Sequence, residues 1–468
     1  MVLFQETFDF NKETKDMVLI ANQNEMTMSL LQSLDINIED FRDEDFSTIF
    51  TLNQIEAKRI HMIGEGKLTN KDSYKKILKS LTGLKKDFII VVESFTAEEK
   101  LKVSRLVEDL VIHSYVNDAY KSKKNDSIVQ IYVSGDHADL VSYHQGVIIG
   151  ESVNRAKDLV NAPYNYMKAK DLADHAKTLA MYEGVTVRIF DKKEIEGMNM
   201  GAFLGVNKGS SDEPYLIFVE YLAEGNKDEP TALVGKGVMF DTGGYSLKPA
   251  QSMPNMKFDM AGSAAVLAAI EGVARLKLNA HVFAIVAATD NRIGDDAIVP
   301  DDVLTSANGK TIEIISTDAE GRLTLADAVW FAQKQGAKKI IDVATLTGAI
   351  VNALGPHYTG AFSNHQEFLD GFKKATDISE EPIWQMPVAK EHHDEIKSLI
   401  ADIKNSGERV AGSSAAAAFI EEFIDEGTAW IHLDIAGTAN NKKNGGTGVM
   451  VRSFIQYFKS LKEGGVCD

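Results

Sequence analysis

The chain has 468 residues, enough for two or more domains, and its hydrophobic content of 44% and charged content of 25% are ordinary for globular proteins. The excess of 68 Asp and Glu over 50 Lys and Arg gives a net charge of −18, which disfavours nucleic acid and acidic membranes as partners because both bind basic surfaces. The single cysteine, Cys467, excludes an intrachain disulfide, and neither a signal-peptide pattern nor a run of roughly 18 apolar residues occurs, so we expect a cytoplasmic protein that does not span a membrane.

The N-terminal part alternates short apolar runs with a helical pattern. Strand-like runs lie at 58–64, 87–93 and 128–134, and residues 98–113 have the periodicity of an amphipathic helix. This alternation predicts a small α/β domain over residues 1–136.

A long helix is expected over residues 137–163, ended by Pro163, and would connect the first domain to a C-terminal domain over 164–468. In the C-terminal domain, helical patterns alternate with runs that are apolar throughout, at 186–190, 215–221, 231–235, 281–288, 339–346 and 429–435. Strands of this kind indicate a sheet that helices cover on both faces. The predicted fold class is therefore α/β, with a central mixed sheet in the larger domain.

The first polar cluster lies at 234–249, V-G-K-G-V-M-F-D-T-G-G-Y-S-L-K-P. Lys236 lies in an apolar run that leads to Asp241, a Gly-Gly turn follows, and Lys248 comes after the turn. Further along, Asp259 directly precedes a helix rich in small residues. Taken singly, each acid is equally well explained as a helix cap or a surface turn, and Lys248 as an exposed lysine. Their joint occurrence at strand and helix ends favours a shared site.

The second cluster is S-T-D-A-E-G-R-L at 316–323. If this segment is extended, Asp318, Glu320 and Arg322 point the same way and place two carboxylates and a guanidinium on one wall. The alternative is a capping turn with an exposed arginine.

The surroundings of this cluster predict a strand before it and a helix after it. Asn308-Gly309 between two strand-like runs indicates a hairpin, T-I-E-I-I at 311–315 has the character of a buried strand, and the pattern after Leu323 is helical. Ligands of open α/β sheets bind at such junctions of strand and helix.

Four carboxylates, those of Asp241, Asp259, Asp318 and Glu320, would repel one another if they were buried together without partners. Divalent cations would remove that repulsion. Oxygen ligands suit Mg, Mn or Zn, and several shared carboxylates favour two ions over one. Only His281 of the 11 histidines lies between the clusters, and no paired-histidine zinc spacing occurs, so metal-bound hydroxide is the expected nucleophile.

These stretches resemble the leucine (cytosol) aminopeptidase family, which consists of dinuclear metallo-exopeptidases. The resemblance covers roughly residues 150–455, and the segment 316–323 is its most specific motif. The other matching stretches are G-K-G-V-M-F-D-T-G-G-Y-S-L-K-P, M-K-F-D-M-A-G-S-A-A, D-V-L-T-S-A-N-G-K-T-I-E-I-I, D-V-A-T-L-T-G-A and G-S-S-A-A-A-A-F-I-E-E-F.

The resemblance implies a role for each residue of the two clusters. The tighter metal site would consist of Lys236, Asp241, Asp259 and Glu320. The exchangeable metal site would consist of Asp241, Asp318 (side chain and carbonyl) and Glu320. Lys248 and Arg322 would be the catalytic pair, with Arg322 binding a bicarbonate that acts as base. A lysine ligand must be neutral, so the metal would have to depress the pKa of Lys236 strongly.

The family resemblance also implies the activity. It implies a catalytic metallopeptidase domain over 164–468 that removes N-terminal residues, Leu and other apolar ones, from short peptides by means of two Mn²⁺ or Zn²⁺ ions. Relatives form hexamers, so a homohexamer is expected. Two alternatives stay open: a two-metal phosphoesterase, which also uses carboxylates, Lys and Arg, and a non-catalytic assembly or regulatory protein on the same fold.

The sequence departs from the family pattern at three places. Ser316 replaces the usual Asn outside the ligand set, and little effect is expected. The stretch 289–303 replaces the family's E-N-M-P-S-G segment and is expected to form a rim loop that affects substrate access. The stretch 161–169 keeps the N-x-P-x-N core without the Thr-Pro that often follows.

Overall fold

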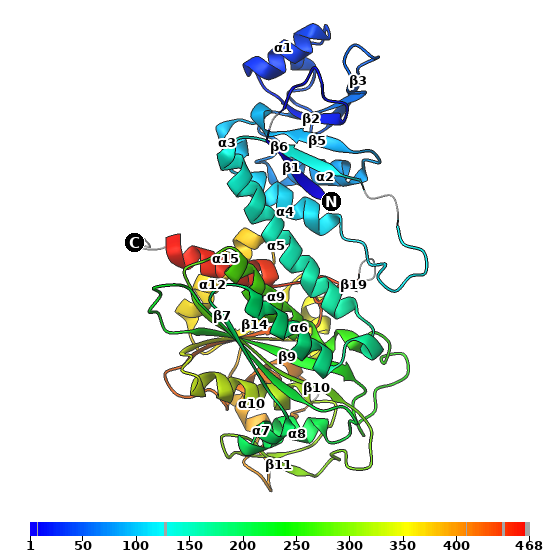
Figure 1. Cartoon of the computed structure of the whole chain (residues 1–468). Coiled ribbons are helices and arrows are strands. Elements are labelled where there is room, and N and C mark those ends of the chain that lie inside the picture. The colour runs from blue at the N-terminus through cyan, green and yellow to red at the C-terminus, as the bar shows by residue number, and fades with distance from the viewer. Residues whose placement is uncertain (7, 126–128, 409, 442–444, 464–468) are drawn as a thin grey trace. The chain divides into compact units, whose positions relative to one another are not determined.

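The computed structural model describes residues 1–6, 8–125, 129–408, 410–441 and 445–463 (Figure 1). By compactness the chain divides into two units, Met1–Glu151 and Ser152–Asp468, and the long helix α5 (His137–Asn161) contains the boundary. The division at 136 and 163 stays a prediction.

The first unit is built on a six-stranded sheet of order β1-β6-β5-β2-β4-β3. All its pairs are parallel except the edge pair of β3 and β4. The central strand β2 is buried along its whole length, as its apolar residues 17–21 require, and its first residue, Asp16, is paired with Arg59. The elements are β1 (Val2–Gln5), β2 (Asp16–Ala21), α1 (Glu25–Ser33), η1 (Ile38–Asp40), β3 (Ser47–Phe50), β4 (Arg59–Gly64), α2 (Lys71–Gly83), β5 (Phe88–Val91), η2 (Val92–Ser94), α3 (Ala97–Lys100), α4 (Val103–His113) and β6 (Ile131–Ser134), where η marks a 3-10 helix.

The second unit contains a mixed eight-stranded sheet of order β15-β14-β17-β13-β9-β10-β8-β7. The middle strands β17, β13, β9 and β10 run parallel, and β8 and β7 continue the sheet antiparallel. A small sheet of order β11-β12-β16 and the pair β18-β19 lie outside it.

The elements of the second unit after α5 are η3 (Tyr164–Tyr166), α6 (Ala169–Thr178), η4 (Leu179–Met181), β7 (Val185–Phe190), α7 (Lys192–Gly197), α8 (Gly201–Asn207), β8 (Tyr215–Leu222), β9 (Thr231–Asp241), η5 (Met256–Met260), α9 (Ala261–Arg275), β10 (His281–Asn291), β11 (Val303–Thr305), β12 (Thr311–Glu313), α10 (Gly321–Lys334), β13 (Lys339–Ala344), α11 (Gly348–Leu354), β14 (Thr359–Ser363), α12 (Gln366–Ser379), β15 (Ile383–Gln385), α13 (Lys390–Glu395), β16 (Ile403–Lys404), α14 (Gly412–Glu421), β17 (Ala429–Asp434), β18 (Asn440–Asn441), β19 (Gly445–Gly446) and α15 (Val451–Glu463).

Strand β9 lies between two helices that cover opposite faces of the sheet. A side chain at Gly235 would collide with Ser263 of α9, whereas the next residue, Lys236, contacts Gly321 at the start of α10. Because successive residues of a strand face opposite sides, β9 presents alternate residues to α9 and α10. Both helices also pack on β10 and β13, as expected for a fully covered sheet (Figure 1).

The predicted α/β class with a central mixed sheet is confirmed, and each apolar run predicted as a strand overlaps one; residue 128, at the start of the run 128–134, lies outside the described residues. The predicted hairpin is present: β11 and β12 pair antiparallel, and Gly309 has a φ of 89°, a conformation that favours glycine. The helix predicted over 98–113 is interrupted between α3 and α4.

The prediction that 289–303 is a rim loop is wrong at its start, because β10 continues to Asn291. Asp290 is buried and accepts hydrogen bonds from Ser210 Oγ and Tyr164 Oη, and Asn291 is buried against β9. Polar side chains in this stretch of the sequence suggest an exposed loop, but Asp290 and Asn291 can be buried because other residues satisfy their hydrogen-bonding groups.

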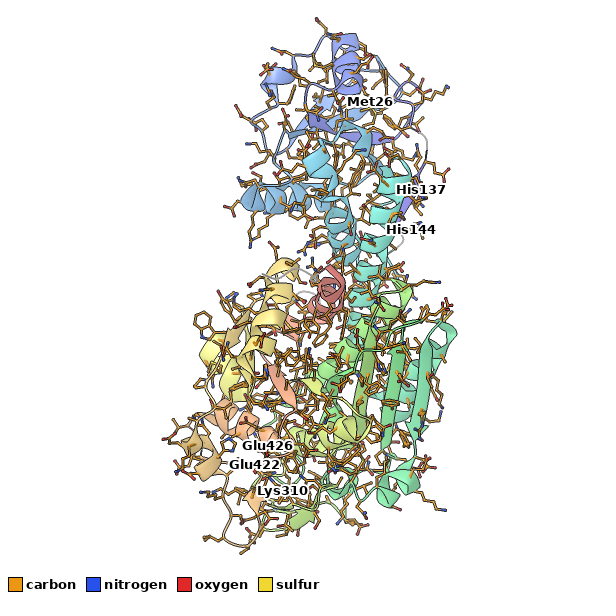
Figure 2. All side chains as sticks on the ribbon, turned by 90° about the vertical axis from the view of Figure 1, so that its left-hand side faces the viewer. Met26, His137, His144, Lys310, Glu422 and Glu426 are labelled. Carbon is orange, nitrogen blue, oxygen red and sulfur yellow. The ribbon has the colours of Figure 1, made fainter. Side chains whose placement is uncertain are left out.

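The β11–β12 hairpin is attached to the end of α14 by Lys310. Its Nζ donates to the carbonyl oxygen of Glu422 at 2.7 Å and also contacts the Glu422 carboxylate (Figure 2). A cation at a helix C-terminus is favourable because the last carbonyls carry partial negative charge. Among the described residues, no helix is both long and apolar enough to cross a membrane.

The contact between α10 and β9 predicts that Gly321 cannot be enlarged. A Cβ at Gly321 would lie 2.5 Å from Lys236 Cε, and Lys236 cannot easily move aside because it is buried and its Nζ is held by Asp259, Glu320 and the Thr345 carbonyl. We therefore expect Gly321→Ala to destabilise the protein by about 1–3 kcal/mol, as overpacking does. The matched control is Gly371→Ala in α12, where a Cβ meets nothing within 4 Å, and there alanine should stabilise by about 0.5–1 kcal/mol. Unfolding by denaturant, followed by circular dichroism, compares the two; equal stabilisation by both substitutions would contradict the close contact.

Candidate metal centre

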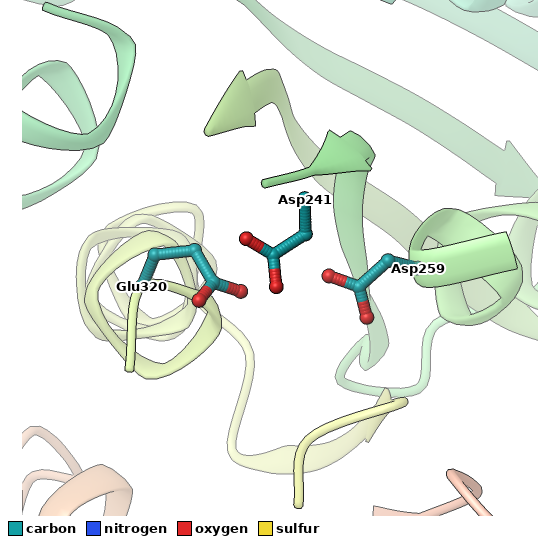
Figure 3. A group of neighbouring side chains, drawn as sticks. All are labelled: Asp241, Asp259 and Glu320. Atoms are coloured by element: carbon teal, nitrogen blue, oxygen red, sulfur yellow. The ribbon is translucent and has the colours of Figure 1, made fainter. Parts of the chain in front are cut away.

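Three buried carboxylates converge where β9 ends (Figure 3). Asp241 is the last residue of β9, Asp259 lies in the short helix η5 just before α9, and Glu320 occupies the N-cap of α10. One oxygen from each carboxylate lies within 4.8 Å of those of the other two. The position matches the rule that ligands of open α/β sheets bind beyond the carboxyl ends of the parallel strands.

Two lysines lie against these carboxylates. Lys236 Nζ lies 2.8 Å from an oxygen of Asp259 and 3.0 Å from one of Glu320, and it donates to the carbonyl oxygen of Thr345 at 3.0 Å. Lys248 Nζ lies 2.7 Å from Asp241 Oδ2. Each lysine therefore neutralises part of the buried negative charge.

Asp318 lies at the outer side of the cluster. Its side chain is 37% exposed, and Oδ1 lies 2.6 Å from Lys248 Nζ. Lys248 Nζ thus contacts the carboxylates of both Asp318 and Asp241. Asp318, the fourth of the predicted carboxylates, is linked to the cluster of the other three by this lysine.

Arg322 lies in the first turn of α10 and is buried. Its Nε has no hydrogen-bond partner among the residues that the structure describes. Burial lowers the pKa of Arg322 to about 10, although Glu320 and Asp434 oppose this shift. The guanidinium therefore stays charged at neutral pH and can hold an anion.

Burial and mutual repulsion disfavour the charged forms of the acids. Burial, with the charge of Asp241 added, raises the pKa of Glu320 and of Asp259 above their ordinary values. Burial alone would lower the pKa of Lys236, but Asp259, Glu320 and Asp241 outweigh it and raise that pKa. The protein groups by themselves hold Lys236 protonated, so a cation that binds its Nζ has to displace a proton.

All seven residues predicted for the site line one cavity of about 600 Å³: Lys236, Asp241, Lys248, Asp259, Asp318, Glu320 and Arg322. Apolar side chains complete the lining, among them Met256, Phe258 and Leu346. No histidine lies among the described residues that line the cavity.

The geometric premise for the second cluster is wrong, although its three charged residues do line the same cavity. The segment is not extended: residues 317–318 form a turn, and α10 begins at Gly321. Asp318, Glu320 and Arg322 therefore converge through a turn and the start of a helix and not through the two-residue period of a strand.

The Gly-Gly turn after β9 brings the backbone close to the acids. Gly243 and Gly244 have φ values of 87° and 62°, which favour glycine, and the Gly243 N–H donates to Asp241 Oδ1 at 2.8 Å. A Cβ at Gly243 would lie 2.7 Å from Asp318 Oδ1. The turn therefore needs glycine both for its conformation and for space.

Two polar residues that contact the carboxylates are missing from the predicted set. Thr345 Oγ1 donates to Asp259 Oδ1 at 2.8 Å, and Asn291 Nδ2 donates to Asp241 Oδ1 at 2.8 Å. Thr345 lies within the stretch D-V-A-T-L-T-G-A at the end of a predicted strand, so its position gave a signal. No such sequence signal marks Asn291, because the polar residues around it suggest a loop.

The donor set fits divalent cations. It contains carboxylate oxygens and the amines of Lys236 and Lys248. Asp259 Oδ2 accepts no hydrogen bond of good geometry from the described residues, although Lys236 Nζ lies 2.8 Å away. Several buried acids around an incompletely satisfied oxygen are the pattern that hard or borderline metal ions stabilise.

Comparison with known proteins agrees with this chemistry. The model of the cytosol aminopeptidase family, catalytic domain, matches residues 154–455. A probable cytosol aminopeptidase from Bacillus licheniformis is 40% identical over 435 residues, which covers 88% of this chain and 87% of that protein. Another, from Clostridium tetani, is 43% identical over 373 residues and covers 77% of each chain.

Among solved structures, a lysine-to-glutamate variant of tomato leucine aminopeptidase is similar, with a TM-score of 0.84 and 28% identity over 98% of this chain and 96% of that one. The similarity thus extends over both units. The chain belongs to the cytosol aminopeptidase family and is an aminopeptidase, a hydrolase of peptide bonds.

Proposed function

We propose that the protein removes N-terminal residues from short peptides with the help of two divalent cations, Mn²⁺ or Zn²⁺, bound in the cavity at the end of β9. The observation that carries this proposal is the convergence of Asp241, Asp259 and Glu320 within 4.8 Å in a buried site. Family membership supports a metal-dependent aminopeptidase.

The proposed ligands are those that the family resemblance implies for these positions. Lys236, Asp241, Asp259 and Glu320 would hold the tighter ion, and Asp241, Asp318 (side chain and carbonyl) and Glu320 the exchangeable one. In support, Lys236 contacts Asp259 and Glu320, whereas Asp318 is reached through Lys248 on the outer side. When bound, the cations would polarise the scissile carbonyl, hold the free α-amine and lower the pKa of a water molecule.

Lys248 is proposed to stabilise the negative charge that develops on the carbonyl oxygen. Its Nζ lies among Asp241 and Asp318, and although burial would lower its pKa, these acids and Glu320 raise it, so the ammonium is available as a charged donor. The apolar lining at Met256, Phe258 and Leu346 supports a preference for Leu and other apolar N-terminal residues.

Arg322 is proposed to hold bicarbonate, which would accept a proton from the attacking water. Its buried charge, its Nε without a partner among the described residues and its place in the cavity lining support this role. No histidine of the described lining could serve as the base instead.

The cellular location and the assembly are proposed from the relatives. Proteins named cytosol aminopeptidases that cover most of this chain support a cytoplasmic location. We propose a homohexamer, as expected from the family resemblance.

Removal of metal is the first test. We expect a chelator to abolish hydrolysis of leucine p-nitroanilide and Mn²⁺ or Zn²⁺ to restore it. Glu320→Ala should reduce kcat/KM by roughly 10³-fold or more even with added metal, since metal catalysis contributes several kcal/mol and each 1.36 kcal/mol is tenfold in rate. Asp370→Ala, an exposed acid of α12, is the control and should behave as wild type.

Full activity in chelator, or turnover of Glu320→Ala near that of wild type, would contradict the metal assignment. The same preparations are assayed on a phosphate monoester. Hydrolysis of the ester in place of the anilide would favour the phosphoesterase alternative.

Loss of Arg322 should be milder than loss of a ligand. We expect Arg322→Ala to lower kcat by about 10²–10⁴-fold, the usual effect of removing a general base. Added bicarbonate should accelerate the wild type in carbonate-depleted buffer and the variant much less. Arg322→Lys, which keeps the charge without the planar fork, should keep part of the response. Equal stimulation of wild type and Arg322→Ala would show that Arg322 does not hold the anion.

The assembly is tested by light scattering coupled to size exclusion, with activity measured across the peak. We expect the activity to elute at the mass of six chains of 51.3 kDa. A fully active species with the mass of one chain would refute the hexamer.

A further inference from the structure

Asn291 lies opposite Asp241 because the pairing of β9 and β10 is irregular at its end. Thr289 pairs with Val238, but Asn291 pairs with Asp241, so β9 contains one extra residue between these two pairs. A bulge of this kind changes the direction of side chains and is common beside functional sites. As a result, the last residue of β10 lies next to the last residue of β9.

The Asn291 amide uses both of its protons on this site. Nδ2 donates to Asp241 Oδ1 at 2.8 Å and to the carbonyl oxygen of Thr317 at 2.9 Å. The backbone carbonyl of Asn291 in turn accepts from Thr242 N at 3.0 Å. Asn291 is only 2% exposed, so water does not compete for these bonds.

These bonds determine how Asp241 is presented. Oδ1 accepts from Asn291 and from the Gly243 N–H, and Oδ2 lies toward Lys248. With two donors on one oxygen, the carboxylate cannot rotate freely about its χ2 angle, and its other oxygen keeps a fixed direction. Groups of this kind behind a ligand set its orientation.

The second bond fixes the other segment that carries proposed ligands. The Thr317 carbonyl directly precedes Asp318, and Thr317 Oγ1 donates to the Gly243 carbonyl at 2.6 Å. One amide therefore connects the end of β9 to the turn before α10. These two segments are 74 residues apart at this contact and have to converge for Asp241 and Asp318 to act together.

We propose that Asn291 is a positioning residue that prepares Asp241 and the turn at Thr317 to bind divalent cations; this rests on the metal centre proposed above. It does not itself touch the reacting atoms. Its side-chain amide donates one hydrogen bond to Asp241 Oδ1 and one to the Thr317 carbonyl oxygen. An aspartate of the same shape has no N–H groups and could not donate either bond.

The test measures Mn²⁺ affinity directly, by calorimetry or competition with a chromogenic chelator, on the full-length protein. We expect Asn291→Ala to weaken binding by about 10–100-fold, the usual effect of losing a partner of a metal ligand. Saturating Mn²⁺ should recover part of the lost activity.

The matched control is Asn207→Ala. Asn207 is also buried, and its Nδ2 donates two bonds, to the Asp212 carbonyl at 2.9 Å and to Thr289 Oγ1 at 3.1 Å, but it contacts none of the carboxylates. Both variants should lose similar thermal stability, whereas Mn²⁺ affinity should fall only in Asn291→Ala. Asn291→Ser replaces the alanine variant if that variant does not fold.

The outcomes separate the two proposals. Failure of the wild type to bind Mn²⁺ or Zn²⁺ would overturn the metal centre. Binding by the wild type with equal affinity in Asn291→Ala would overturn the role of Asn291 alone, and so would an equal loss of affinity in Asn207→Ala.

Discussion

Burial of several carboxylates at the end of one strand is the constraint on which the rest of the site depends. Two unit charges 4 Å apart near a protein surface interact by roughly 4 kcal/mol, so Asp241, Asp259 and Glu320 cannot all be charged without nearby positive charge. Lys236 and Lys248 supply part of it, and burial, with the charge of Asp241 added, still raises the pKa of Glu320 and of Asp259 above their ordinary values. Divalent cations would supply the rest of that positive charge.

The backbone around the site follows from the need to bring these acids together. Small residues stand where chain segments touch: Gly235 against α9, Gly321 against Lys236, and Gly243 against Asp318. The bulge at the end of β9 has the same effect, since it places Asn291 beside Asp241. Close approach of strand, turn and helix is therefore built into the fold at this edge of the sheet.

The sequence could predict the strands and the charged lining of the cavity because both leave local patterns. Apolar runs mark β9, β10 and β13, and the acids stand where those runs stop or where a helix begins. The hairpin at Asn308-Gly309 was predictable for the same reason, since its turn chemistry is local.

Features that depend on pairing between distant segments left no such pattern. Nothing near Asn291 indicates a bulge in β9, so the polar residues T-D-N suggest a loop although they are buried. In the segment 316–323, alternate charges suggest a strand, but a turn and the N-terminus of α10 bring the same side chains together. The two-residue period therefore predicts that these three side chains lie together, and they do line one cavity, but through a turn and a helix start and not through a strand.

The choice of lysine and arginine in this cavity follows from their chemistry. In the proposed ligand set Lys236 must give up a proton to bind a metal ion. A lysine can do so when the divalent ion neutralises the surrounding carboxylates in place of the ammonium group. Arg322, in the first turn of α10, keeps its charge because even deep burial leaves its pKa at about 10. A guanidinium at position 236 could not become a ligand, and an amine at position 322 would lack the planar fork that matches an anion with two oxygens. Lys236 and Arg322 are therefore not interchangeable. The positive charge of Lys236 can be replaced by that of a metal ion, whereas the positive charge of Arg322 has to persist for an anion to bind.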